Sequence, residues 1–169
     1  EAARVHEMLR TKLSPDPASI AKENDLDLGI FEAVEDARIN HNARIYSLPQ
    51  DVAPAEWISD VLKNVHSDPR YSEGQKRRQI AEILISYSKR LNFKEVTLPA
   101  TDYNDIFHVI QLPCSSINRY ASQSIAVTKT LMDALKNLEE MRDLDKKAKA
   151  AVGASLEQQR QTGRKDERE

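Results

Sequence analysis

The sequence is poor in the residues from which many functional sites are built. A single cysteine, Cys114, excludes a disulfide within the chain, so nothing requires an oxidising compartment. Only four glycines are present, and none belongs to a nucleotide-binding pattern such as G-x-G-x-x-G or G-x-x-x-x-G-K-[ST]. The four histidines are scattered singly, without the H-x-x-x-H spacing or the cysteine pair of a metal site. We therefore expect no cofactor and no bound metal.

Long apolar runs are also missing, and aromatic residues make up only 5% of the chain. No stretch approaches the roughly 18 consecutive apolar residues of a transmembrane helix, and the amino terminus shows no signal-peptide pattern. We expect no membrane insertion, and a location in an intracellular, reducing compartment or inside a particle. The chain begins at Glu1 instead of methionine, so upstream targeting signals would be missing if it is a trimmed or processed product.

The overall composition favours helices. Charged residues account for 31% and apolar residues for 40% of the 169 residues, a length that suits one domain and an appendage. Apolar residues at three-four spacing predict helices over residues 2–13, 17–24 and 27–39, another from about Pro54, and a basic core helix over 73–91. The net charge of −2 excludes a global attraction to nucleic acid or anionic lipid.

Three extended stretches interrupt the helical pattern. Residues 43–49, 94–99 and 106–113 each end in Leu-Pro, and proline disfavours a helical conformation in the residue before it. They predict short strands or extended connectors, and strands here would form a minor β-sheet.

A heptad pattern begins at Ile117 and predicts one long helix over residues 117–152. Nine of its eleven a and d positions are apolar; the a positions are Ile117, Ser124, Leu131, Leu138, Asp145 and Val152, and the d positions are Tyr120, Val127, Ala134, Met141 and Ala148. Such a helix would be roughly 54 Å long at 1.5 Å per residue. The apolar stripe is widened by Leu135, Leu144 and Ala151, which favours a multi-helix bundle, or one half packed on the body, over an isolated pair of helices.

The predicted organisation has three parts. A mainly α-helical globular body spans residues 1–113 and includes a helical hairpin at 16–39; a long coiled-coil-like helix spans 114–156; and a charged, flexible tail spans 157–169. The fold class is mainly α.

The hairpin resembles a helix-turn-helix in spacing, but its charge disfavours DNA binding. Residues 16–36 contain seven acids and one lysine, a net charge of −6, and phosphates would repel an acidic recognition helix. We therefore interpret it as a plain helical hairpin. Aspartate tolerates the left-handed conformation that the turn position requires, so Asp25 suits that position.

Residues 70–94 carry the opposite charge, with seven bases and two acids for a net of +5. The acidic and basic segments could contact each other within one chain or between copies, or form two solvated helix faces. A third interpretation is contact with a phosphate or RNA backbone through Lys76, Arg77, Arg78, Lys89 and Arg90.

Cys114 and His108 are the one pair that could be imagined as a nucleophile and its base. His108 lies inside an apolar run, however, and we expect Cys114 to be a packed or loop residue. No catalytic residues are predicted, and we expect no enzymatic activity.

The long helix leads to the functional hypothesis. We expect a non-enzymatic structural or assembly protein that self-associates, or docks to other protein, through Tyr120, Val127, Leu131, Leu138 and Met141. It would suit a component of a larger particle, for example viral or secretion machinery. The alternative is a nucleic-acid-associated or regulatory adaptor that uses a degenerate helix-turn-helix and the basic 70–94 face.

Overall fold

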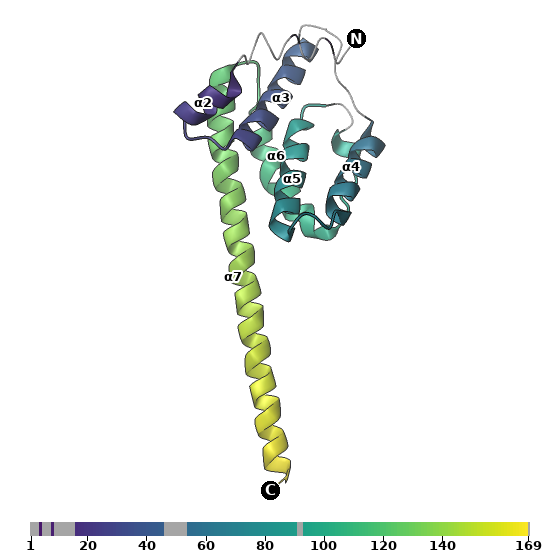
Figure 1. Cartoon of the computed structure of the whole chain (residues 1–169), viewed down its shortest axis with the longest axis vertical. Coiled ribbons are helices and arrows are strands. Elements are labelled where there is room, and N and C mark those ends of the chain that lie inside the picture. Colours follow the sequence, from purple (N-terminus) through teal and green to yellow (C-terminus); the bar gives the residue numbers. More distant parts are fainter. Residues whose placement is uncertain (1–3, 5–7, 9–15, 46–53, 91–92, 169) are drawn as a thin grey trace. The chain divides into compact units, whose positions relative to one another are not determined.

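The computed structural model describes residues 16–45, 54–90 and 93–168, together with Arg4 and Met8. These residues form α2 (Pro17–Glu23), α3 (Leu28–Ile45), α4 (Ala55–Ser67), α5 (Glu73–Ser86), η1 (Phe93–Glu95), η2 (Thr101–Tyr103), α6 (Asn104–Ser115) and α7 (Ala121–Arg168), as Figure 1 shows. The described residues contain no strand. The fold is all-α and has a long carboxy-terminal helix, which confirms the predicted class. The helix expected over residues 2–13 falls almost entirely outside the described residues.

The chain divides into two compact units, Glu1–Leu135 and Lys136–Glu169. The division falls inside α7, whereas the sequence placed the end of the globular body at residue 113. The first turns of α7 therefore belong to the first unit, and the remainder forms the second unit. Residues 157–168, for which we expected a flexible tail, are helical as the last turns of α7.

Local capping explains the α2–α3 hairpin. The Asp16 carboxylate accepts hydrogen bonds from the Ser19 backbone N–H at 3.2 Å and the Ser19 hydroxyl at 2.6 Å, and Pro17 occupies the first helical position. The turn between the helices places Asp25 at a φ of 53°, the left-handed conformation expected for this residue. The Asp27 side chain then accepts the Ile30 N–H at 3.1 Å and starts α3.

Helix α3 forms the buried centre of the first unit. Phe31, Val34 and Ile39 are almost completely buried, and so are several polar residues of the same helix. A helix buried on all sides shows no amphipathic pattern, because every face contacts protein. Its buried charges are paired: Arg38 donates to the Glu35 carboxylate at 2.6 and 3.0 Å.

Helix α5 packs against this centre. It also contacts α4 and α6, and it buries Ile80, Leu84 and Ile85, so the segment predicted as a core helix does lie in the core. The helix ends at Ser86, earlier than the predicted residue 91. A capping box between Ser72 and Gln75 starts α5, with reciprocal hydrogen bonds of 3.2 and 2.8 Å.

The prediction of short strands is wrong where the structure describes those residues. Residues 106–113 lie in α6, whose buried residues Ile106, Ile110 and Cys114 follow one another at the four-residue spacing of a helix face. Pro113 stands in the last turn of α6, so it interrupts the hydrogen bonds only near the end of the helix. Residues 43–45 are the end of α3, and residues 46–49 lie outside the described part of the structure. Residues 94–99 contain part of η1 followed by irregular chain, so a connector, the other predicted arrangement, is what forms there.

The first turns of α7 complete the core of the first unit. Ile125 and Met132 pack on a cluster formed by Ala21, Leu26 and Phe31. The Met132 sulfur also accepts a hydrogen bond from the Asp27 N–H at 3.3 Å. Helix α7 therefore begins as part of the globular body, joined to the α2–α3 hairpin.

Candidate protein-binding surface

An apolar stripe lies exposed on α7 in the second unit. Met141, Leu144, Val152 and Leu156 are 68%, 65%, 60% and 59% exposed, respectively. Separations of three, eight and four residues put these side chains on one side of a helix. We call these four residues the α7 stripe. Single exposed apolar residues are ordinary, but several on one helix face are typical of a surface that contacts another protein.

The stripe continues toward the start of α7, but there the chain itself covers it. Val127 and Leu131 are 4% and 0% exposed within the first unit. Their neighbours Ser124 and Thr128 are also buried. Because these side chains already pack in the core, they are not available to a partner in this structure.

The five residues predicted for a protein interface therefore divide into two groups. Val127 and Leu131 are core residues of the first unit, so they are not part of the α7 stripe. Met141 and Tyr120 are exposed, and Leu138 is half-buried. Tyr120 lies immediately before α7, where the Arg119 guanidinium donates to its hydroxyl at 2.8 Å.

Exposed ion pairs accompany the stripe. Lys149 and Asp145 approach to 3.0 Å one turn apart, and Arg160 and Glu157 to 3.7 Å, with all four side chains largely exposed. Pairs of this kind contribute only a few tenths of a kcal/mol to helix stability. Packing against a partner would therefore contribute much more to this helix than its own ion pairs do.

The basic segment 70–94 is largely occupied by contacts within the chain. Arg77 is buried, donating to the Asp102 carbonyl at 2.6 Å and to the Asp105 carboxylate at 2.8 Å. These bonds join α5 to the start of α6. Arg78 forms ion pairs with Asp27 and with Glu82, the latter at 3.1 Å. The acidic and basic segments thus meet within one chain, which was one of the arrangements that the sequence left open.

Two more of the bases proposed for phosphate contact are also engaged. The Lys89 ammonium donates to the Ser115 carbonyl at 3.3 Å, and the Arg90 guanidinium lies 3.7 Å from the centre of the Tyr87 ring. Lys76 is half-exposed near the start of α5. Lys76, Arg77, Arg78, Lys89 and Arg90 therefore do not form one exposed surface for a nucleic-acid backbone.

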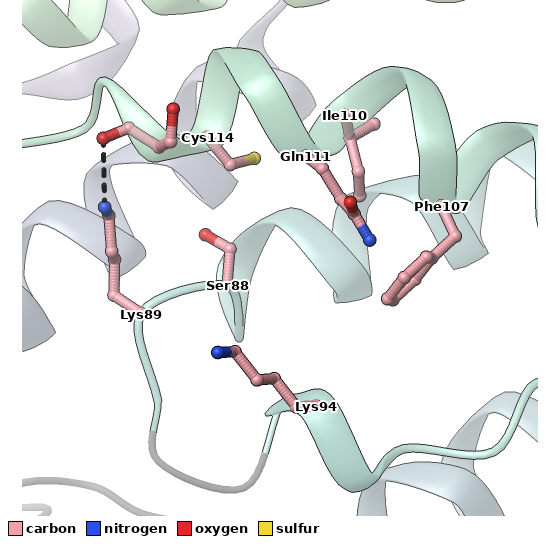
Figure 2. A pocket seen from close by; sticks show the side chains of 8 residues that line it. Ser88, Lys89, Lys94, Phe107, Ile110, Gln111 and Cys114 are labelled. Atoms are coloured by element: carbon pink, nitrogen blue, oxygen red, sulfur yellow. Dashed lines mark hydrogen bonds between the residues drawn. The ribbon is translucent and has the colours of Figure 1, made fainter.

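A cavity of about 470 Å³ lies between α6 and the segment that follows α5. Its lining combines an apolar part with amide, hydroxyl and ammonium groups (Figure 2); the residues are Ser88, Lys89, Lys94, Phe107, Ile110, Gln111, Cys114 and Ser115. Burial, together with the positive charge of Arg44, lowers the pKa of Lys89. The lining holds no carboxylate, so its chemistry suits an anionic group better than a cationic one.

Cys114 is buried beside this cavity, and burial raises the pKa of its thiol to about 11. A protonated thiol is a poor nucleophile. His108 is exposed and lies six residues earlier on α6, a separation that turns it away from the face of Cys114. The two residues therefore do not form a nucleophile and base pair in this structure.

Two kinds of feature are absent from the residues that the structure describes. Among these residues, no helix combines the length and the apolar character that spanning a membrane requires. Nor do they contain a group of three or more His, Cys, Asp or Glu side chains placed to hold a metal ion.

Comparisons of the chain with protein-family models, with curated protein sequences and with solved structures found no match.

The central position of α3 in the first unit was not predicted from the sequence. For the acidic segment 16–36 the sequence left open either a solvated face or contact with the basic segment; in the structure Glu35 is buried with Arg38, and Asp27 pairs with Arg78. A usable signal was present: Ile30, Phe31, Val34 and Ile39 place apolar groups on more than one side of a helix. That pattern is typical of a central helix.

Proposed function

We propose that this chain is a non-enzymatic structural protein that self-associates through the α7 stripe of its second unit. The exposure of Met141, Leu144, Val152 and Leu156 on one side of a helix is the observation that supports this proposal. Burying apolar surface contributes about 25 cal/mol per Å², so covering four large side chains would strongly favour association.

Contact with a partner would also stabilise the helix of the second unit. Within residues 136–169 the structure describes one helix, and an isolated helix in water is only marginally stable. Packing of an apolar face supplies most of the stability of helices in proteins. A partner that covers the α7 stripe would supply it here.

A second copy is a suitable partner because the segment is nearly neutral. Residues 136–155 contain four acids and five bases, a net charge of +1, so two copies do not strongly repel one another. The nucleic-acid alternative has less support, because most of the bases in 70–94 are engaged inside the chain. A place in a larger particle stays a prediction from the sequence.

Measuring the mass in solution tests the proposal. Analytical ultracentrifugation of the full chain at tens of micromolar should give a mass above that of one chain. The variant Met141→Ser, Leu144→Ser, Val152→Ser, Leu156→Ser should lower the mass to one chain, because it removes the apolar surface.

The control separates lost contacts from lost helix propensity. Ala150→Ser, Ala154→Ser and Gln161→Ser lie on the opposite side of α7 and should leave the mass unchanged, although they also introduce serines into the helix. If the unmodified chain is a single copy at several hundred micromolar, or if the stripe variant keeps its mass, self-association through this surface is wrong.

A further inference from the structure

Charge is distributed unevenly along the second unit. Residues 136–145 contain four acids and two bases, a net charge of −2. Residues 146–155 contain three lysines, Lys146, Lys147 and Lys149, and no acid, a net charge of +3. Both segments lie on α7, and the α7 stripe runs along both.

This distribution distinguishes the two ways in which a pair of such helices can align. In a parallel pair, each segment lies beside its own copy, so −2 faces −2 and +3 faces +3. In an antiparallel pair, the acidic segment of each copy faces the basic segment of the other. Complementary charges favour the antiparallel arrangement, and like charges disfavour the parallel one.

We infer that the α7 stripe binds a second copy of the same helix in the antiparallel direction, with the twofold axis near residues 146 and 147. This inference rests on the proposed self-association and adds the orientation of the partner to it. The interface is isologous, so each contact occurs twice, once on either side of the axis.

The a and d positions of the heptad fit the same axis. In antiparallel coiled helices an a position of one copy lies opposite a d position of the other. An axis between residues 146 and 147 puts Met141 opposite Val152 of the second copy and Asp145 opposite Ala148. Lys149 of the second copy follows Ala148 directly and is therefore close to Asp145. Asp145 contacts Lys149 of its own helix at 3.0 Å, and in the pair it can instead contact Lys149 of the second copy.

Distances between spin labels test the orientation. A label on Gln158→Cys, in a Cys114→Ser background, lies about 11.5 residues from the proposed axis. At 1.5 Å per residue, two such labels in an antiparallel pair are about 35 Å apart along the helix direction, whereas a parallel pair brings them near the interaxial spacing of about 10 Å. Pulsed electron paramagnetic resonance separates these outcomes, and the shorter distance would overturn the inference.

A label on Ala150→Cys provides the control for pairing itself. This position is 3.5 residues from the axis, so its two labels lie level with each other in a parallel pair and only about 10 Å apart along the helix direction in an antiparallel pair. Because Ala150 is on the side of α7 opposite the stripe, the two labels lie across the pair from each other, at a similar separation in both orientations. A dipolar signal at 150 together with the shorter separation at 158 contradicts the orientation but supports self-association. Absence of any dipolar signal at both positions, with the mass of a single chain, contradicts self-association as well.

Reversing the basic segment gives an independent test. The variant Lys146→Glu, Lys147→Glu, Lys149→Glu changes the segment from +3 to −3. An antiparallel pair would then place −3 against −2, and we expect at least tenfold weaker association at low salt. In a parallel pair the substituted segments would face each other as −3 against −3 instead of +3 against +3, so the repulsion and the affinity would stay similar. An unchanged affinity would therefore contradict the antiparallel orientation.

Discussion

The Cys114 thiol is buried on α6, and burial raises its pKa from an ordinary value of 9.0 to about 11. The neighbouring Ser88 hydroxyl and the charge of Lys89 act in the opposite direction but do not offset burial. The protein therefore keeps its only thiol protonated at neutral pH, in agreement with the expectation that Cys114 is a packed residue.

We predict that Cys114 reacts slowly with iodoacetamide in the folded chain. At pH 8 the fraction of thiolate is about 100-fold lower for a pKa near 11 than for one near 9, so alkylation should be at least that much slower than in denaturant. Mass spectrometry of the quenched reaction measures the rate. Equal rates in folded and unfolded chains would show that the thiol is accessible and ordinary.

The same shift has a consequence for stability at high pH. The folded-state pKa lies above that of the unfolded chain, so the unfolded chain releases the proton first as the pH rises. The contribution of the buried, protonated Cys114 to the free energy of unfolding is fully present below about pH 9 and is lost toward pH 11. Cys114→Ala should remove this part of the pH dependence.

Arg77 connects two helices from a buried position. Its guanidinium is 3% exposed and bonds Asp105 at 2.8 Å and the Asp102 carbonyl at 2.6 Å. Removing Arg77 takes away a counter-charge of the half-buried Asp105 carboxylate and the donor to the Asp102 carbonyl, which is destabilising.

We expect Arg77→Ala to lower the free energy of unfolding by about 2 to 4 kcal/mol. Arg70→Ala provides the matched control, because Arg70 pairs with Asp68 on the surface, and that change should be too small to measure. Chemical denaturation followed by fluorescence of Trp57, the only tryptophan, reports on the first unit. A similar effect of both substitutions would contradict the structural role assigned to Arg77.

At the scale of elements, α7 changes its role along its length. Its first turns bury Val127 and Leu131 in the first unit, whereas Met141 and Leu144 in the second unit are exposed. The apolar heptad positions of α7 therefore lie in the core in the first turns of the helix and on an exposed surface in the later turns.

This division predicts different outcomes for two similar substitutions. Leu131→Ala should lower the free energy of unfolding of the first unit by about 2 to 4 kcal/mol, because it removes a side chain that is 0% exposed. Met141→Ala should leave that stability unchanged and weaken self-association instead. Denaturation and sedimentation, applied to both variants, distinguish the two effects. Destabilisation of the first unit by Met141→Ala would contradict the division.

Helix α6 shows why local signals misled the prediction of strands. Leu-Pro at 112–113 disfavours helix at Leu112, but Ile106, Ile110 and Cys114 all become buried if the segment is helical. Burial of three apolar side chains outweighs the local preference of one residue. The cost of Pro113 is small because it stands in the last turn.

At the scale of the whole molecule, the two units should differ in stability. The first unit has a buried core around α3, whereas within the second unit the structure describes a single helix with an exposed apolar stripe. Backbone amides of an isolated helix open readily, and those of a packed helix exchange slowly.

We therefore predict that hydrogen exchange in residues 136–160 depends on protein concentration. These amides should exchange rapidly at low micromolar concentration and slow down as the chain self-associates, while α3 and α5 remain protected throughout. Exchange measured by mass spectrometry at two concentrations tests this. Protection of 136–160 that does not change with concentration would mean that the helix is stable without a partner.

Residue patterns alone were sufficient for the class of fold, the α2–α3 hairpin, the place of α5 in the core and the long final helix. Helical periodicity, caps such as Asp16 and Ser72, and the left-handed turn at Asp25 are short-range properties, and neighbouring residues encode them directly. The contact between the acidic and basic segments was one of several arrangements that those patterns allowed.

Only tertiary packing decided which apolar residues of α7 face the core and which remain exposed. Val127 and Met141 occupy equivalent heptad positions, and nothing local distinguishes them. They differ because the first turns of α7 pack within the first unit, where Ile125 and Met132 contact the α2–α3 hairpin from a distant part of the chain, whereas Met141 lies exposed in the second unit. Burial depends on contacts between distant segments, so the location of the exposed stripe could be read only from the folded chain.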